Sequence, residues 1–330
     1  AGLLDKNPYL NSKEKIVLDS PEERQTAYDI ATQSVVLLEN NGVLPLNDYF
    51  STIQLLNSQL HKRQDSLSST KVLLTGPNAN SMWAMCGDYS FPAMTYFWKK
   101  VTEDLDHPHV VTLLEGMKAQ KPEGVEILYS RGCDWTDSIE TDFVKNGDAR
   151  AWEYELLHRK VDSGEKADKD EALRMAKDAD IIIAAVGENV MLCGENRDRQ
   201  GLRLPGRQEQ YVEELIATGK PVVLIVFGGR AQVISGLAEK CAAVIQAWYP
   251  GEEGGNAVAD ILYGKVSPSA KLAISYPNKE IYTPVCYNYA TEPDSCIQWP
   301  FGYGLTYTTF EYKHMALDEE AKTTDEYIDL

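Results

Sequence analysis

The sequence predicts an α/β fold: a three-layer sandwich in which a mostly parallel six-stranded sheet carries helices on both faces. Two observations predict it. Short, almost wholly apolar runs recur along the chain, and segments with helical periodicity separate most of them. Apolar runs of this length are typical of parallel strands that are buried on both faces. Their alternation with helices is the βαβ pattern, in which each helix crosses one face of the sheet.

The first element expected is a helix near the start of the chain. Ser20 and Glu23 form a capping-box pattern, with Pro21 at the first helical position. Small and apolar residues then recur at helical spacing as far as Leu38. The Asn-Asn-Gly run at residues 40–42 is expected to end this helix, because glycine commonly follows a helix C-terminus.

The later elements alternate between strand and helix. Strands are expected at residues 71–75, 125–129, 181–186, 222–227 and 242–247, with 272–276 as a candidate sixth. Helices are expected at residues 171–178, 208–217, 232–240 and 254–262. Polar segments interrupt the alternation at residues 49–69, 107–108 and 134–169. We expect them to be surface excursions from one large domain, because connecting segments usually run over the surface.

The composition argues against two classes of partner. No apolar run approaches the ~20 residues that span a bilayer, so no membrane partner is expected. The net charge is −18, whereas affinity for nucleic acid depends on cations that neutralise phosphates. No nucleic-acid partner is therefore expected, and a neutral substrate such as a sugar fits this charge better.

Neither metal nor cofactor is expected from the motifs. The six cysteines form no C-x-x-C or Cys/His metal-ligand spacing, and their disulfide state stays open. The dinucleotide pattern G-x-G-x-x-G, the phosphate-binding pattern G-x-x-x-x-G-K and the serine-hydrolase pattern G-x-S-x-G are all absent. The sequence thus offers no support for dinucleotide binding, phosphoryl transfer or serine hydrolysis.

The segment that follows the strand at residues 181–186 is the main candidate site. It carries Glu188 and Glu195 with Arg197 and Arg199, among glycine and asparagine residues. In open α/β sheets, ligands bind at the carboxyl ends of the strands. Two carboxylates and two cations at such an end form a polar site. The alternative, a solvated loop held by surface ion pairs, stays open on this pattern alone.

Nine segments, in order along the chain, resemble glycoside hydrolase family 3. They are N-P-Y at 7–9, S-V-V-L-L-E-N-N-G-V-L-P-L at 34–46, G-P-N-A at 76–79, G-D-Y-S-F-P-A at 87–93, R-G-C-D at 131–134, G-E-N-R-D-R at 194–199, L-P-G-R-Q at 204–208, W-Y-P-G-E-E-G-G-N-A at 248–257 and P-F-G-Y-G-L-T-Y-T-T-F at 300–310. Each segment alone is weak evidence for the family. Nine in the order of the family are specific, and they resemble β-glucosidases and β-xylosidases.

The resemblance implies a domain organisation. Members of this family carry an N-terminal (β/α)8 barrel with the aspartate nucleophile, followed by a flavodoxin-like α/β sandwich. Residues 1–16 are accordingly expected to be the exit of a missing barrel and a linker, and residues 17–305 the sandwich domain. Residues 306–330 are expected to be a linker and the truncated start of a fibronectin type III-like domain.

The resemblance also implies a function. The chain is expected to be the second domain of a retaining β-glycosidase that hydrolyses terminal β-linked glucose or xylose. Its partners would be a β-glycoside or oligosaccharide and the barrel domain, without which we expect no activity. A periplasmic or secreted location is expected, and the choice of sugar stays open. The alternative is a non-catalytic carbohydrate-binding or structural module that braces the barrel.

Glu195 is the expected general acid/base. Retaining glycosidases use two carboxyl groups about 5–5.5 Å apart, one as nucleophile and one as acid and then base. The G-E-N-R-D-R segment resembles the family segment whose glutamate is the acid/base, and this glutamate falls on Glu195. Asn196 and Arg197 depart from the Gly-Tyr pair of the family. Glu188, which lies nearer the strand end and could pair with Arg199, is the competing candidate.

Three further residues are candidates for substrate binding. Asp88 and Tyr89 could hydrogen-bond and stack on a sugar, with Trp83 nearby; alternatively, they anchor their loop in a domain interface. Arg199 could contact substrate or orient the acid/base, or it could only hold its loop in place. The glycines of residues 248–255 are interpreted as structural, because glycine permits close packing.

Overall fold

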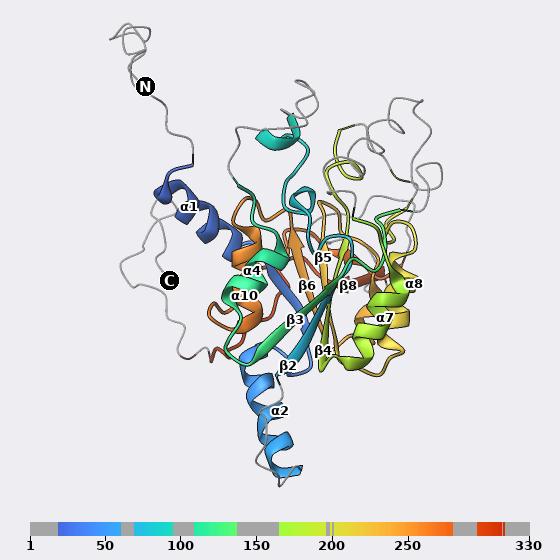
Figure 1. The fold of residues 1–330 in the computed structure, drawn as a ribbon. Helices are drawn as coiled ribbons and strands as arrows, with labels where there is room; N and C mark the ends of the chain where they lie inside the picture. The colour runs from blue at the N-terminus through green and yellow to red at the C-terminus, as the bar shows by residue number, and fades with distance from the viewer. Residues whose placement is uncertain are drawn as a thin grey trace, which may run out of the picture.

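A six-stranded sheet runs through the centre of the protein (Figure 1). The computed structural model describes residues 19–60, 69–94, 109–136, 165–195, 199, 201–279, 296–311 and 313, without the side chains of 56–60. The strands lie in the order β1-β6-β5-β4-β2-β3, and they are β1 (Val36–Asn40), β2 (Thr70–Thr75), β3 (Val125–Ser130), β4 (Ile181–Gly187), β5 (Val222–Phe227) and β6 (Ala243–Trp248). β2 to β6 pair in parallel, and β1 pairs antiparallel with β6. The predicted mostly parallel sheet is confirmed.

Helices cover both faces of the sheet, as predicted. One face carries α4 (Leu113–Gln120) and α10 (Gly254–Tyr263), and the other carries α7 (Lys169–Asp178) and α8 (Gln208–Ile216) (Figure 1). The short helix α9 (Ser235–Ala238) packs into the same core as α7 and α8. The central strand β4 is wholly buried. Its Ile183 packs into the α4–α10 core, whereas its neighbour Ile182 packs into the α7–α8 core. Period-2 alternation thus divides one apolar run between two cores.

The first helix is shorter than the sequence predicts. The capping box at Ser20 forms, but α1 (Pro21–Thr32) ends well before Leu38. Residues 36–40 are instead β1, and the expected helix end at residues 40–42 is wrong. Val35 to Leu38 are four consecutive buried residues. A strand covered on both faces buries such a run, whereas a surface helix buries only one stripe.

Two later expectations also need correction. Residues 272–276 do not form the sixth strand of the main sheet, a position that β1 takes. β7 (Tyr276–Pro277) pairs instead with β8 (Ile297–Trp299) in a separate two-stranded sheet. Part of the polar segment 49–69 is helical: α2 (Leu46–Leu60) begins in the core at Leu46 and Phe50 and then projects from the body (Figure 1).

Several expected segments fall outside the described residues. They are 107–108, most of the insertion at 134–169, the expected barrel exit at 1–16 and the chain beyond 313. The expected domain boundaries therefore stay predictions. Among the described helices, none has both the length and the apolar character that a bilayer crossing requires.

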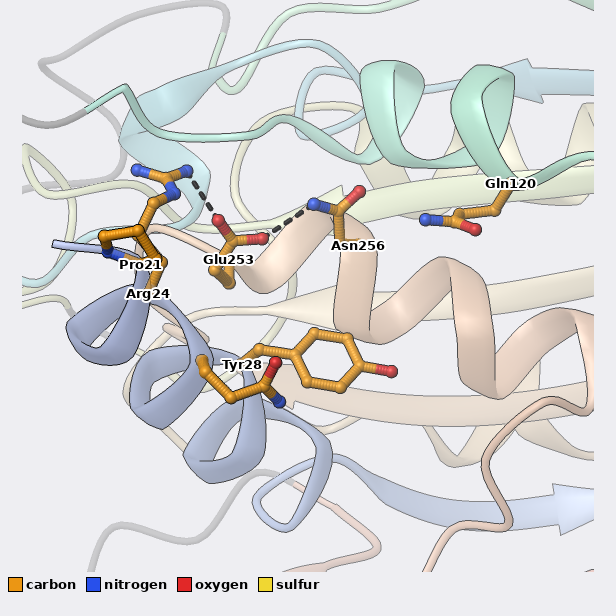
Figure 2. Close-up of a pocket in the computed structure, with 7 residues that line it drawn as sticks. Pro21, Arg24, Tyr28, Gln120, Glu253 and Asn256 are labelled. Atoms are coloured by element: carbon orange, nitrogen blue, oxygen red, sulfur yellow. Dashed lines mark hydrogen bonds and ion pairs between the residues drawn. The ribbon is translucent and has the colours of Figure 1, made fainter. Parts of the chain in front are cut away.

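α1 docks on α10 through polar contacts around a pocket of about 270 Å³ (Figure 2). Arg24 forms an ion pair with Glu253 at 2.5 Å, and Glu253 also accepts a hydrogen bond from Asn256 at 2.6 Å. Tyr28 Oη donates to Asp260 at 2.7 Å, and burial together with this carboxylate raises the pKa of the Tyr28 phenol. These contacts hold α1 against α10 beside the pocket.

Glycines let α4 and α10 approach closely. A Cβ at Gly116 of α4 would overlap the backbone carbonyl of Gly255, and a Cβ at Gly255 of α10 would overlap the carbonyl of Thr112. The backbones leave no space for a side chain at either position. The structural interpretation of the glycines in residues 248–255 is therefore confirmed at Gly255.

We expect Gly255→Ala to lower the free energy of unfolding by about 1–3 kcal/mol, because the added methyl group forces the two helices apart. Gly236→Ala in α9 is the matched control, since a Cβ there meets nothing within 4 Å. Alanine at this site should be neutral or stabilising, by up to roughly 1 kcal/mol. Urea unfolding midpoints measure both. Equal midpoints for the two variants would contradict the close packing.

Candidate functional site

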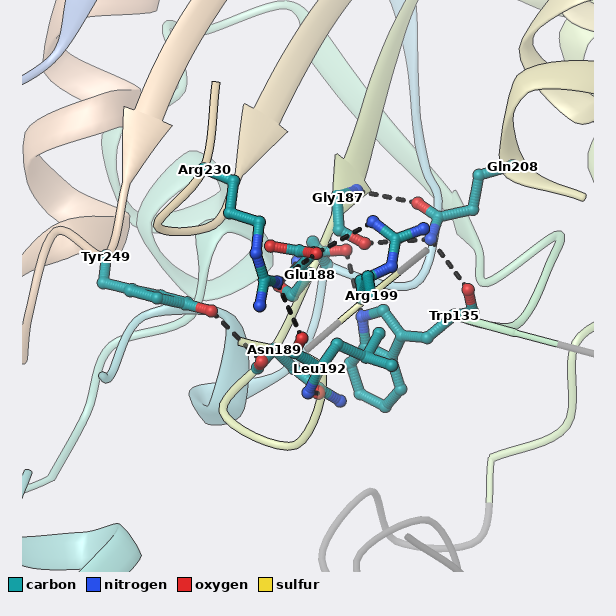
Figure 3. Close-up of polar contacts among 10 residues, drawn as sticks. Trp135, Gly187, Glu188, Asn189, Leu192, Arg199, Gln208, Arg230 and Tyr249 are labelled. Carbon is teal, nitrogen blue, oxygen red and sulfur yellow. Dashed lines mark hydrogen bonds and ion pairs between the residues drawn. The ribbon is translucent and has the colours of Figure 1, made fainter. Parts of the chain in front are cut away.

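The candidate site lies at the carboxyl edge of the parallel sheet (Figure 3). Its centre is the segment that follows β4, residues 188–201, which we name the β4 loop. Residues 196–198 and 200, which include the Asn196–Arg197 departure from the family segment, lie outside the described part of the chain. Loops after β2, β5 and β6 surround the β4 loop.

Glu188, the first residue of the β4 loop, is wholly buried and ion-paired. Its Oε1 lies 2.9 Å from Arg199 Nη1 and 2.7 Å from Arg230 Nη1 (Figure 3). Burial acts to lower the pKa of the Arg230 guanidinium, but the charge and hydrogen bond of Glu188, together with other neighbouring groups, act in the opposite direction and the pKa is raised. A carboxylate buried between two guanidinium groups holds the loop and is closed to a substrate.

The first half of the β4 loop is fixed to the body. Asn189 Oδ1 accepts hydrogen bonds from the backbone N–H groups of Met191 at 2.9 Å and Leu192 at 3.2 Å. Tyr249 Oη donates to the carbonyl of Asn189, and Arg230 donates to the carbonyl of Leu192 at 2.8 Å (Figure 3). Burial raises the pKa of the Tyr249 phenol well above its ordinary value, so this group is a donor at neutral pH.

Side-chain amides connect β4 to its neighbours at the same edge. Gln208, at the start of α8, accepts from Gly187 N at 2.7 Å and donates to the carbonyls of Gly187 and Trp135 at 2.9 Å each (Figure 3). Asn78, which follows β2, donates to the carbonyl of Glu188 at 2.8 Å and accepts from Trp135 Nε1 at 3.0 Å. Both amides are buried. They satisfy backbone groups that would otherwise be buried without partners.

The sequence reasoning missed these fixing residues. Asn78 and Gln208 lie in two of the family-like segments, G-P-N-A and L-P-G-R-Q, but no role was assigned to them. Arg230 and Tyr249 follow the ends of β5 and β6. Position at a strand end is the signal that could have found them, because the carboxyl ends of parallel strands meet at one edge.

Glu195 is exposed and meets two of the other predicted site residues. Its backbone N–H donates to Asp88 Oδ2 at 3.1 Å, and Tyr89 Oη donates to Glu195 Oε2. Asp88 and Tyr89 come from the segment that follows the short helix η1 (Met82–Ala84). Tyr89 is itself 66% exposed. Three residues selected from the sequence thus lie together, with Asp88 and Tyr89 in contact with Glu195 of the β4 loop.

Two other expected site residues lie elsewhere. Arg199 pairs with the buried Glu188 rather than with Glu195, in agreement with the interpretation that it holds its loop. Trp83 is 1% exposed and packs in the α4–α10 core, so its ring does not face a substrate.

Of the two glutamates of the β4 loop, Glu195 is the one that is accessible for proton transfer. Glu195 is exposed and carries a hydrogen-bond donor on one oxygen, whereas Glu188 is buried and neutralised. No group of three or more His, Cys, Asp or Glu side chains in the described ranges could hold a metal ion. The thiols of Cys86, Cys193, Cys241 and Cys296 are free.

Comparisons with known proteins agree with this fold. Residues 35–307 match the model of the glycosyl hydrolase family 3 C-terminal domain. The chain is 29% identical to a β-xylosidase from Formosa agariphila over 96% of its own length and 38% of that protein. It is 29% identical to a periplasmic β-glucosidase from Salmonella typhimurium over 97% of its length and 40% of that protein.

A solved structure gives the same result. The β-glucosidase from Erythrobacter marinus is 31% identical, with a TM-score of 0.59 over 89% of this chain and 36% of that one. The chain therefore spans about two fifths of the length of the curated relatives that it matches. The match to the family model covers the whole six-stranded sheet, the helices on both of its faces and the β4 loop. The chain belongs to glycoside hydrolase family 3, of which it carries the C-terminal domain.

Proposed function

We propose that this domain supplies the general acid/base, Glu195, of a retaining β-glycosidase that acts on terminal β-linked glucose or xylose. The observation that carries the proposal is the contrast between the two glutamates of the β4 loop. Glu195 is exposed at the carboxyl edge of the sheet, whereas Glu188 is buried between two arginines. A group that protonates a leaving oxygen must reach the substrate, and this requirement favours Glu195.

The reaction divides between two domains. In a double displacement, a nucleophilic carboxylate attacks the sugar while a second carboxyl group protonates the departing oxygen. The second group then removes a proton from the water that hydrolyses the glycosyl-enzyme. We propose that Glu195 performs both proton transfers and that the nucleophile is the aspartate of a barrel domain. β-Glucosidases and β-xylosidases among the relatives support this substrate class.

A non-catalytic sugar-binding or bracing module is the second candidate. Tyr89, which contacts Glu195, is 66% exposed, and Phe91, two residues further along the same segment, is 49% exposed. Exposed aromatic rings of this kind could stack on a sugar without any chemistry. In that case, truncation of Glu195 would change substrate affinity rather than turnover.

Glu195→Ala in the full-length protein should lower kcat on aryl β-glycosides with poor leaving groups by about 10²–10⁴-fold, because proton transfer is lost. Azide with an activated substrate should restore part of the rate. Glu239→Ala, an exposed carboxylate at the end of α9, is the matched control and should leave kcat unchanged. Full activity of Glu195→Ala would contradict the proposal.

Glu188→Gln should lower the free energy of unfolding by about 3–5 kcal/mol, because two guanidinium groups lose their buried counter-ion. Urea unfolding measures the loss. Azide should not restore any activity that is lost with it, because the substitution alters the path of the β4 loop and does not remove the acid/base. Unchanged stability with activity restored by azide would instead identify Glu188 as the acid/base.

The isolated 330-residue chain should not hydrolyse nitrophenyl glucoside or xyloside, because one carboxyl group cannot act as both nucleophile and acid/base. Absorbance of released nitrophenol measures this directly. Turnover by the pure chain that Glu195→Ala abolishes would show that the domain carries a complete site.

A further inference from the structure

The segment that carries Asp88 and Tyr89 holds Glu195 at two separate points. Asp88 Oδ2 accepts the backbone N–H of Glu195 at 3.1 Å, and Tyr89 Oη donates to the Glu195 carboxylate. One contact acts on the main chain and the other on the side chain. Together they restrain both the place of the residue and the rotation of its carboxyl group.

Such a restraint is needed at this position. Glu195 is exposed and directly follows Gly194, so burial does not restrict its side chain. The buried anchors of the β4 loop lie earlier, at Val190, Met191 and Leu192. Proton transfer depends on a donor held within hydrogen-bond reach of the reacting oxygen. The contacts from Asp88 and Tyr89 come from outside the loop and supply this restraint.

We propose that Asp88 and Tyr89 are positioning residues for Glu195, and not the sugar-binding groups that the sequence alone suggests. The inference rests on the proposed role of Glu195. The Tyr89 hydroxyl occupies Oε2 and leaves Oε1 to carry the transferred proton. In the first step this proton passes to the glycosidic oxygen, which keeps the electron pair of the broken C–O bond. Tyr89 retains its own proton throughout.

Substrates with different leaving groups distinguish a residue that positions the acid from a residue that binds the sugar. Tyr89→Phe removes the hydroxyl and keeps the ring. In the full-length protein it should lower kcat/KM for methyl or other alkyl β-glycosides about tenfold, because their departing oxygen needs a proton. For 2,4-dinitrophenyl glycosides, whose leaving group departs unprotonated, the loss should be about twofold at most. Asp88→Ala should give the same pattern, with KM nearly constant.

A double-mutant cycle tests whether Tyr89 acts through Glu195. In a Glu195→Gln background, adding Tyr89→Phe should leave the residual kcat/KM for 4-nitrophenyl glycosides unchanged, since coupled residues are not additive. Unchanged urea midpoints establish that each variant folds. Three results would each overturn the inference. Tyr89→Phe could lower kcat/KM equally for alkyl and 2,4-dinitrophenyl glycosides through a higher KM, or it could lower kcat/KM as much in the Glu195→Gln background as in the parent. The third result is that Tyr89→Phe leaves kcat/KM unchanged.

The same cycle separates this inference from the proposed function. If Glu195→Gln alone retains full kcat/KM on alkyl glycosides, Glu195 is not the acid, and both statements are wrong. If Glu195→Gln is inactive on alkyl glycosides while Tyr89→Phe behaves like the parent, only the positioning role is wrong.

Discussion

A carboxylate that is wholly buried requires cations, and this requirement organises the carboxyl edge of the sheet. Glu188 leaves the end of β4 with no exposed surface and meets Arg199 and Arg230. Arg199 lies eleven residues further along the same loop, and Arg230 follows β5. The pairs therefore close the β4 loop on itself and connect it to the neighbouring strand. An unpaired charge at this depth would cost several kcal/mol, so the path of the loop is strongly constrained.

Hydrogen bonds hold the base of the β4 loop, whereas Glu195, further along the loop, is exposed. Below Glu195, the backbone is held by Asn189, Tyr249 and Arg230, and the carbonyl of Glu188 is held by Asn78. Strand ends in the centre of a parallel sheet are among the least mobile parts of an α/β domain, and loops that they carry can hold functional groups at fixed positions. The domain thus presents Glu195 outward from a hydrogen-bonded base.

The two glutamates of this loop illustrate how environment divides roles between like side chains. Both follow the same strand, and both are carboxylates among arginines in the sequence. Burial with two counter-ions makes Glu188 a structural group, whereas exposure leaves Glu195 accessible for chemistry. Asp88 and Tyr89 contact the exposed Glu195, whereas Arg199 pairs with the buried Glu188. An exposed and hydrogen-bonded carboxylate is what the proposed site, shared with a second domain, requires.

The amino-acid sequence by itself determined the parallel strands, such as Ile181–Gly187, and the loop in which Glu195 lies, because apolar runs and strand-end motifs are local signals. The nine family-like segments also selected Asp88, Tyr89 and Glu195, which the fold brings together. Only the tertiary structure decided that Val36–Asn40 is an antiparallel edge strand, that Trp83 is buried and that Arg199 pairs with Glu188. Strand pairing, burial and ion pairing depend on which distant segments pack together, and no local pattern specifies that choice.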